Sequence, residues 1–357
     1  MPSQPSPSLP QPREIELDFL RGIAILLVLD FHSPAPLLTL IFGAKNPGWA
    51  GVDIFFVLSG FLVGGLLIKE WRLRGRADGR RFLIRRAFKI WPQYYVFLLF
   101  LVLRHHATLY DLRGLLLNIQ NYVGPFTQMW SLAVEEHTYL FLIAFFAVAA
   151  RLRATPRHVM AALAALCAIV LALKLILTAY GFQTFAATHT RVDGILYGVI
   201  LALIYHCAPD RFRRLESLRW LWILVVAAAI LYFCFPPPTL WSIPVHWIFA
   251  DAMAVALLLL LYRGGKHWRP YRVIARIGVY SYGIFLWHMS VYPTVDVISH
   301  NPIWQRLGPY ILGIAAGIIA TELIEFPTLR LRERLFPRRV DSPVGIPAIL
   351  EPPTRSF

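Results

Sequence analysis

Ten apolar runs, each of roughly 17 to 25 residues, constrain the fold of this chain more than any other feature of its sequence. A helix needs about 20 apolar residues to cross the hydrocarbon core of a bilayer. Of the 357 residues, 57% are hydrophobic and only 15% are charged. We therefore predict an all-α fold, a polytopic integral membrane bundle of about ten transmembrane helices. The runs lie near 16–34, 50–69, 87–104, 130–150, 158–180, 190–207, 219–235, 242–262, 274–296 and 307–326.

The basic residues alternate from loop to loop in the way that orients a chain across a membrane. The sequence holds 35 lysines and arginines against 20 acidic residues, and 28 of the 35 fall in alternate loops and the two tails. Only four fall in the intervening loops. Because cytoplasmic loops are enriched in Lys and Arg, we predict that both termini are cytoplasmic. This distribution also accounts for the net charge of +15 without a nucleic-acid partner.

The chain is expected to form one transmembrane domain with a short tail at each end. Residues 1–14 are mostly Pro, Ser and Gln, and residues 337–357 contain repeated prolines, so we predict disordered cytoplasmic tails around a transmembrane domain at 15–336. The three cysteines lie in or beside apolar runs at unrelated spacings, which indicates neither a disulfide pattern nor a metal site.

The first apolar run carries four ionisable residues, Asp18, Arg21, Asp30 and His32, although such groups are costly inside a bilayer. Arg21 and His32 are 11 residues apart, close to a whole number of helical turns, so they share a face. Asp18 lies one turn before Arg21 and near enough to pair with it, whereas Asp30 points to the other side. The alternative is that Arg21 extends to the interface and that His32 simply sits at the far end.

Two further runs begin with acidic residues at the predicted outer surface. Asp53 lies near the start of the second run. The fourth run begins at Trp130, with Ser131 as a candidate N-cap and with Glu135 and Glu136 about one turn later. A solvated helix start and a bundle-facing role for one of the two glutamates are both open.

Polar residues in the later runs have plainer interpretations. Arg191 and Asp193 open the sixth run and are interpreted as a structural ion pair. Ser281 and His288 are seven residues apart in the body of the ninth run and share a face. A single His in such a helix is more often a hydrogen-bonded core residue than a catalyst. Glu325 is expected to close the tenth run at the inner side.

A basic cluster precedes the third run on the predicted cytoplasmic side. Arg85, Arg86 and Lys89 occupy adjacent helical positions, and Pro92 is expected to bend or restart the helix. Membrane topology alone explains one or two of these charges. A cluster this dense would also hold phosphate groups well.

Taken in order, these motifs resemble those of the acyltransferase family 3 membrane proteins, which O-acylate sugars and related hydroxyl compounds. The resemblance covers the chain from Leu17 to about Pro327. It rests on Leu17–Arg21 with His32, Gly51–Phe61, Arg85-Arg86 with Lys89 and Pro92, Trp130–Glu136, Arg191–Gly194, Ser281–His288 and Glu325–Pro327.

The resemblance implies ten core helices, a cytoplasmic acyl-CoA donor, and an acceptor usually presented on the outside. It also implies that Arg21, His32 and the basic pair before the third run are the functional positions. Two departures from the family pattern stand out. Lys89 replaces a usual Arg, which would loosen phosphate contacts, and His137-Thr138 replaces a commoner polar-aromatic pair, which would alter the acceptor pocket.

From these observations we predict a membrane-embedded O-acyltransferase of a bacterial cytoplasmic membrane. It would move an acyl group, acetyl by the family resemblance, from acyl-CoA to a hydroxyl of a carbohydrate or glycolipid acceptor such as a cell-surface polysaccharide. His32 is the predicted catalytic base, because an imidazole has an unperturbed pKa of about 6.5. Its predicted partner is Glu135, with Asp53 as the alternative.

The remaining predicted site residues bind the donor or support the reaction. The donor would be bound by Arg21, Arg85, Arg86 and Lys89. The supporting residues are Asp18, Asp53, Trp130, Ser131, Glu136, Arg191, Asp193, Ser281, His288 and Glu325.

Two other classes of function compete with the enzyme. A proton-coupled secondary transporter also uses ionisable groups inside the membrane, but the sequence has no inverted repeat and no matching pair of broken helices. A non-catalytic bundle that organises other membrane enzymes would tolerate replacement of His32.

Overall fold

The computed structural model describes residues 12–42, 47–104, 108, 110–123, 127–235, 242–262 and 269–337, and within these ranges it contains helices and turns but no strand. The predicted disordered tails fall almost wholly outside the described residues. The α-helices are α1 (Pro12–His32), α2 (Thr39–Phe42), α3 (Gly51–Ser59), α4 (Gly65–Arg74), α5 (Gly79–Leu103), α6 (Arg113–Leu116), α7 (Trp130–Arg151), α8 (Pro156–Ala179), α9 (Thr188–Arg191), α10 (Asp193–Cys207), α11 (Pro209–Ser217), α12 (Arg219–Cys234), α13 (Ser242–Leu261), α14 (Arg269–Val279), α15 (Ser281–Trp287), α16 (Tyr292–Ile298), α17 (Pro302–Ala320) and α18 (Phe326–Leu335). The 3₁₀ turns are η1 (Pro47–Ala50), η3 (Thr127–Met129) and η4 (His288–Val291), and the π-helical turns are η2 (Gly60–Gly64) and η5 (Thr321–Glu325).

A helix or helices occupy each of the ten predicted runs, which supports the all-α membrane fold. In the described residues, five stretches are long and apolar enough to cross a membrane: Pro47–Arg74, Trp130–Arg151, Pro156–Ala179, Pro244–Leu261 and Pro302–Leu335. A sixth span would consist of α10 and α11, which meet at 118°. The number ten and the cytoplasmic termini stay predictions.

Local sequence sets where several helices begin and end. The side chains of Asp78 and Thr155 accept hydrogen bonds from backbone N–H groups in the first turns of α5 and α8. Asn301 caps α17 in the same way. Gly75, with φ of 71°, ends α4 in a left-handed conformation that an L-residue adopts at a cost.

The ninth and tenth runs differ from their predicted boundaries, and prolines account for part of each difference. The predicted span 274–296 is divided into α14, α15, η4 and α16, and Pro293, which lacks a backbone N–H, lies in the first turn of the last of these helices. The tenth run does not close at Glu325. It continues through η5 into α18, where Pro327 again lies in the first turn and leaves the helix unbroken. Helix α5 likewise continues through Pro92.

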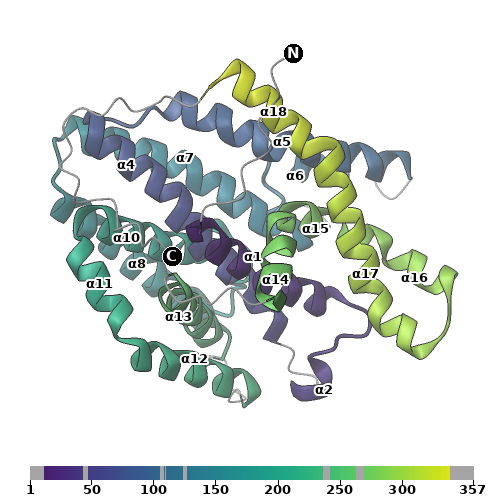
Figure 1. Ribbon diagram of the computed structural model, residues 1–357. Helices are drawn as coiled ribbons and strands as arrows, with labels where there is room; N and C mark the ends of the chain where they lie inside the picture. The colour runs from purple at the N-terminus through teal and green to yellow at the C-terminus, as the bar shows by residue number, and fades with distance from the viewer. Residues whose placement is uncertain are drawn as a thin grey trace.

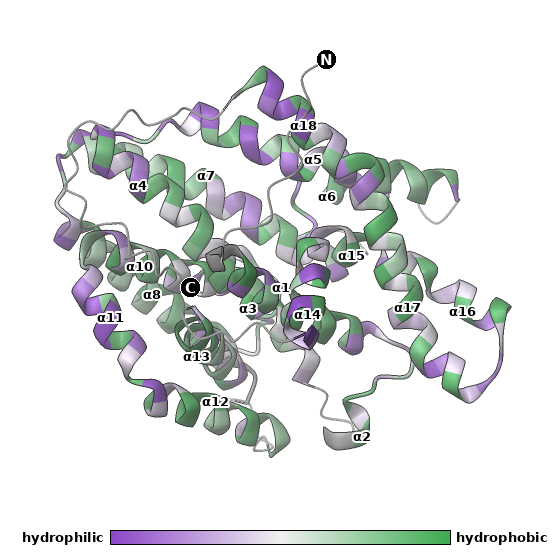
Figure 2. Cartoon of the chain, in the orientation of Figure 1, coloured by the Kyte–Doolittle hydropathy of each residue, from purple (hydrophilic) through white to green (hydrophobic). Residues whose placement is uncertain are grey.

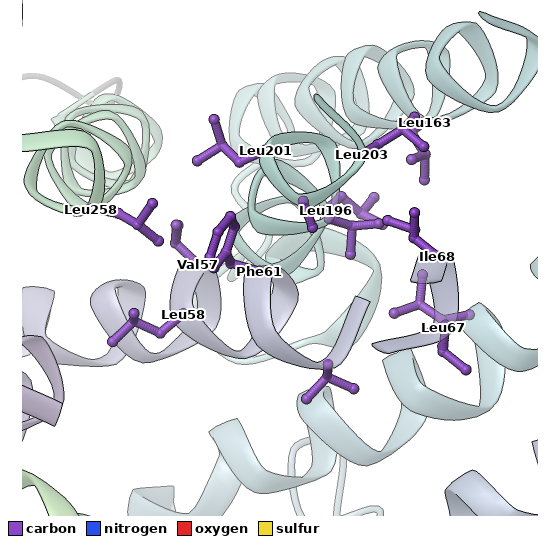
Figure 3. Close-up of a cluster of buried hydrophobic side chains, with 14 of the residues drawn as sticks. Val57, Leu58, Phe61, Leu67, Ile68, Leu163, Leu196, Leu201, Leu203 and Leu258 are labelled. Atoms are coloured by element: carbon purple, nitrogen blue, oxygen red, sulfur yellow. The ribbon is translucent and has the colours of Figure 1, made fainter. Parts of the chain in front are cut away.

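Glycines bring the second run against α10 at backbone contact. A Cβ on Gly60 would lie 1.9 Å from the carbonyl oxygen of Ile195, and one on Gly198 would lie 2.1 Å from that of Val57. Close approach of this kind is how helices associate in a bilayer, where burial of apolar surface gives no drive. Figure 3 shows the leucine-rich core around this contact, where Val57 and Phe61 face Leu196 and Leu258 lies nearby.

Helix α1 is packed inside the bundle, with α14 against one side. A Cβ on Gly22 would meet the carbonyl oxygen of Ile274 at 2.1 Å, and one on Gly278 would meet that of Asp18 at 1.8 Å. Figure 1 shows α1 in the middle of the fold, with α17 and α18 forming a long rod along one side. Figure 2 shows hydrophobic residues along α12 and α13, and hydrophilic residues along α11 and where α5 packs with α18.

Candidate active site

A cavity of about 200 Å³ lies between α1, α3, α5, α7, α14 and α15; we call it the apolar cavity because most of its wall is aliphatic or aromatic. Its polar wall residues come from five different helices and would face whatever occupies it. They are Arg21, Ser59, Arg86, Lys89, Ser131, Glu135, Tyr139, Ser281 and Tyr282, and the others are Val52, Phe55, Phe56, Leu58, Leu62, Val63, Ile90, Leu132, Gly278, Val279 and Phe285.

Arg21 lies in the wall of the apolar cavity and is paired with Asp18, as the sequence predicted. Its Nη1 is 2.6 Å from Asp18 Oδ1, and its side chain keeps 36% of its accessible surface. A guanidinium that is paired on one side and open to a cavity on the other can still donate to an anion. Asp30 points elsewhere, and accepts hydrogen bonds from Tyr310 Oη at 2.5 Å and from the backbone N–H of Leu37 at 2.7 Å.

Glu135 faces the same cavity from α7. It accepts a hydrogen bond from Tyr139 Oη at 3.1 Å, and that hydroxyl lies 2.8 Å from Ser59 Oγ. Among the described residues, no hydrogen bond joins Glu135 to His32, so the predicted pairing of these two is wrong in this structure. The carboxylate is held on the side of the cavity that α3 and α7 form, away from the end of α1.

The other residues at the start of α7 are also placed by the structure. Ser131 is not an N-cap, because the helix follows directly on the 3₁₀ turn η3 and begins two residues earlier than predicted, with Met129 at the cap position. Ser131 instead lines the apolar cavity. Trp130 packs its ring against Phe56 at 5.7 Å, and Glu136 has a buried Oε1 with no hydrogen-bond partner among the described residues.

A second and larger cavity of about 610 Å³ lies between α4, α5 and α18, and we call it the cationic cavity. Seven basic side chains and one acidic side chain face it. They are Lys69, Arg74, Arg81, Arg85, Arg86, Lys89, Arg332 and Glu70, and the rest of the wall is Leu66, Leu67, Leu73, Phe82 and Leu329. Arg86 and Lys89 line both cavities, so the two share part of one wall.

The three cations of the predicted phosphate cluster differ in their partners. Arg85 is paired with Glu333 at 2.7 Å, and Lys89 is paired with Glu325, whose own side chain is 1% exposed. Arg86 has no ion pair among the described residues, and its guanidinium lies 5.6 and 5.7 Å from the ring centres of Phe82 and Tyr139. Arg86 therefore differs from the other two in forming no ion pair, although it lines the apolar cavity together with Glu135 and lies near enough to that carboxylate to interact with its charge.

His32 lies at the C-terminal end of α1 and lines neither cavity. Its Nδ1 is 3.1 Å from the carbonyl oxygen of Val28 and 3.3 Å from Nε2 of His288. His288 is 1% exposed and opens the 3₁₀ turn η4. Phe285, one turn before His288, lines the apolar cavity, so the histidine pair lies directly behind part of the cavity wall. Ser281, predicted to share a face with His288, faces the cavity instead.

A separate set of five charged residues, which we call the buried ion cluster, joins α3, α8, α9, α10 and α13. Its members are Asp53, Lys174, Arg191, Asp193 and Asp251, and each is 3% exposed or less. Asp53 binds Arg191, and Lys174 binds Asp193 at 2.7 Å. The predicted Arg191–Asp193 pair is therefore wrong, because a helix break at Val192 turns the two side chains toward different partners.

The sequence did not predict Asp251 and Lys174 as members of this cluster, nor Trp247 as a residue packed against it. The guanidinium of Arg191 lies 3.8 Å from the ring centre of Trp247. Asp251 lies beside Gly194, and neither of its carboxylate oxygens has a hydrogen-bond partner among the described residues. A signal was present, because both Lys174 and Asp251 interrupt strongly apolar runs. Within the described ranges, no group of three or more His, Cys, Asp or Glu side chains could hold a metal ion.

Comparison with known proteins places the chain in a family. A family model described as an acyltransferase domain matches residues 14–327. The peptidoglycan O-acetyltransferase OatA of Listeria monocytogenes is 27% identical over an alignment 362 positions long, which covers 86% of this chain and 54% of that protein. YrhL of Bacillus subtilis, whose name assigns it provisionally to the same activity, is 25% identical over 91% of this chain and 56% of its own length.

The chain thus spans a little over half of the length of these two relatives. No solved structure matches it. The match favours an acyltransferase over a transporter, and the resemblance carried by the ordered motifs is confirmed. Because the family model covers most of the sequence, this protein belongs to the acyltransferase family 3 of membrane proteins.

Proposed function

We propose that this protein transfers an acyl group, acetyl by the names of its relatives, from acyl-CoA to a hydroxyl group of a carbohydrate or glycolipid acceptor. The observation that carries the proposal is the shared wall of the two cavities. A cavity lined by seven cations, which outnumber the acids they pair with, adjoins an apolar cavity lined by Arg21 and Glu135. A cationic cavity next to an apolar one matches the chemistry of acyl-CoA. This donor has phosphates at one end and a thin, weakly polar arm that carries the thioester at the other.

The cationic cavity would hold the phosphates of the donor. Arg is suited to phosphate because its guanidinium donates two parallel hydrogen bonds, and such charge-assisted bonds are the strong ones. Arg86 would bind first, because unlike Arg85 and Lys89 it does not have to leave an ion pair with an acid. Arg85 and Lys89 would contribute after partial release from Glu333 and Glu325. In the predicted topology this cavity opens to the cytoplasm, where acyl-CoA is available.

Transfer itself requires a base near the thioester. The acceptor hydroxyl oxygen would attack the thioester carbonyl carbon while its proton passes to His32. The carbon–sulfur bond then breaks, and the proton passes from His32 to the departing sulfur, which gives the O-acyl product and free CoA. An acyl-His32 intermediate, formed on the imidazole and consumed by the hydroxyl, gives the same products.

Because His32 lies behind Phe285, the mechanism requires the reacting groups to come into contact with a base outside the apolar cavity. The thioester would lie beside Phe285, and this side chain would have to turn aside when the donor binds, so that His32 comes within hydrogen-bond reach of the acceptor hydroxyl. Glu135 faces the cavity directly and would act on the acyl end of the donor rather than on His32. We therefore expect Glu135→Gln to slow transfer less than His32→Ala does.

The test uses the purified protein in lipid nanodiscs with acetyl-CoA, and measures the release of free CoA with and without soluble glycan acceptors. His32→Ala should lower this rate by about 10²- to 10⁴-fold, the usual contribution of a positioned base. His300→Ala is the matched control, because His300 is exposed and lines neither cavity. Equal rates for wild type and His32→Ala would contradict the assignment of the base.

The acceptor is a separate question with a separate measurement. Mass spectra of cell-surface glycans from a deletion strain and from wild type should differ by the mass of one acyl group on one class of glycan. The missing mass identifies the acyl group and its carrier together. Identical spectra, with acetyl-CoA turnover intact in the purified protein, would remove surface glycans as the acceptor.

A further inference from the structure

The contacts of the His32–His288 pair determine which ring nitrogens carry hydrogen. Nδ1 of His288 lies 2.8 Å from the carbonyl oxygen of Phe285 and 3.1 Å from that of Ile284. A carbonyl oxygen only accepts hydrogen bonds, so this nitrogen is the N–H donor. In a neutral imidazole the other nitrogen is then an acceptor, and Nε2 of His288 is the atom that faces His32.

The same reasoning applies to the second ring. Nδ1 of His32 lies 3.1 Å from the carbonyl oxygen of Val28 and 3.3 Å from Nε2 of His288, and both of these atoms are acceptors. Nδ1 of His32 must therefore carry the hydrogen. Its Nε2 is left with a free lone pair, which is the form that a general base needs.

We propose that His288 is a positioning residue, which together with the Val28 carbonyl holds His32 in the Nδ1–H tautomer, and which fixes the rotation of that ring so that the basic Nε2 is directed toward the reacting hydroxyl. This inference rests on the proposed function, because it assigns His288 a role only through His32. Burial decides which histidine is the base and which is the positioning residue. His288 is 1% exposed, whereas His32 at the end of α1 is half-buried and can be reached by a substrate.

The packing around His288 fits this role. His288, the first residue of η4, packs closely against α17, where a Cβ on Gly313 would lie 3.2 Å from His288 Cβ. The two backbone carbonyls fix the rotation of the ring, and the Tyr292 ring packs on it edge to face with centroids 5.8 Å apart. A ring held on several sides can orient its neighbour at little entropic cost.

A neutral partner also differs from the carboxylate that the sequence suggested. A carboxylate beside a base stabilises the imidazolium that forms, but in an apolar bundle it must be desolvated even when the base is neutral. His288 avoids that cost and still fixes the tautomer, as the buried acid does in hydrolase triads. Asp30, the acid nearest in sequence, is occupied by Tyr310 and the Leu37 backbone.

Two substitutions at His288 separate positioning from packing. His288→Phe keeps a ring of similar size but removes the acceptor, whereas His288→Gln places an amide oxygen near the lost Nε2. In nanodiscs with acetyl-CoA, we expect His288→Phe to lower kcat on the order of 10²-fold with the donor KM unchanged. His288→Gln should recover kcat to within roughly tenfold of wild type, the worth of one imperfect hydrogen bond.

The outcomes distinguish this inference from the proposed function. If His32→Ala abolishes transfer while His288→Phe retains wild-type kcat, the inference is overturned and the base assignment stands. If His32→Ala retains wild-type kcat, both fail. Equal losses in the Phe and Gln variants, with a raised donor KM, would also overturn the inference, because they indicate a role in packing.

A measurement on the unchanged protein covers the case in which the variants do not fold. Solid-state ¹⁵N NMR of histidine-labelled protein, with His32→Ala and His288→Gln used for assignment where they are obtained, reports the protonation of each ring nitrogen. We expect hydrogen on Nδ1 and none on Nε2 for both rings. Hydrogen on Nε2 of His32 in the resting protein would overturn the inference directly.

Discussion

In the cationic cavity seven basic side chains outnumber their three acidic partners, Glu70, Glu325 and Glu333, whereas the buried ion cluster combines two basic and three acidic side chains, each 3% exposed or less. Both sites are built around arginine, and both lie among apolar helices. In the buried ion cluster both cations are paired with acids from other helices, and these ion pairs connect the helices to one another. The cationic cavity leaves positive charge unbalanced and exposed to an opening. The partners of an arginine, rather than its depth in the bundle, therefore separate a structural charge from one that can bind a ligand.

The comparison predicts its largest effect on stability at Arg191. Arg191→Gln should destabilise the protein by about 3–5 kcal/mol, because it leaves Asp53 buried without its cation. Thermal unfolding in detergent, followed by intrinsic tryptophan fluorescence, measures the change. Arg213→Gln is the control, since Arg213 pairs with Asp210 on the exposed surface of α11 and should show no measurable change. A small effect at Arg191 would show that the cluster does not hold the bundle together.

The corresponding change in the cationic cavity should affect binding and not folding. Arg86→Ala is expected to weaken acetyl-CoA binding by about 10- to 100-fold, the worth of a charge-assisted contact to phosphate, with the unfolding temperature unchanged. Arg85→Ala should weaken binding less, because Arg85 must partly leave Glu333 to reach a phosphate. Isothermal titration with a non-hydrolysable acyl-CoA analogue measures both. The reverse order of the two effects would contradict the account of their partners.

Salt should affect the cationic cavity and the buried ion cluster differently, but with a smaller effect than the substitutions. Raising the salt concentration from about 0.1 to 1 M shortens the Debye length from about 10 to 3 Å, which screens charges that face solvent but not those sealed in the interior. We expect donor affinity to fall several-fold and the unfolding temperature to change little. A donor affinity that does not respond to salt would remove phosphate recognition by the cationic cavity from the proposal.

The sequence predicted those parts of the molecule that depend on neighbours along one helix. The apolar runs marked the helices, and the Asp18–Arg21 pair and the Arg85–Arg86–Lys89 cluster follow from spacing within one helix. The resemblance to the family added the order of the motifs. Each of these signals is local, so a single sequence carries it.

Contacts between distant helices could not be predicted in the same way. His32 and His288 meet across 256 residues, and Asp53 and Arg191 across 138, through packing that no spacing rule reports. Arg191 and Asp193 were paired in the prediction because they are neighbours in sequence, but the break at Val192 separates them. The same limit explains why Glu135 seemed a partner for His32: depth in the membrane was predicted, but the face of the bundle was not.

The smallest predicted effect tests the buried ion cluster at its odd member. Asp251 is 3% exposed, and its carboxylate oxygens make no hydrogen bond or ion pair among the described residues, whereas Asp53 is bound to Arg191. Asp251→Asn keeps the shape of the side chain and removes no direct partner, so we expect stability to change by less than about 1 kcal/mol or to rise. Asp53→Asn is the matched variant at the same depth, and it should destabilise because it weakens the pairing of Arg191. Thermal unfolding of the two variants side by side decides the matter. If Asp251→Asn destabilises the protein as much as Asp53→Asn does, Asp251 contributes to stabilising the two cations of the cluster. Asp251 would then have to be counted with Asp53 and Asp193 among the acids that balance Arg191 and Lys174.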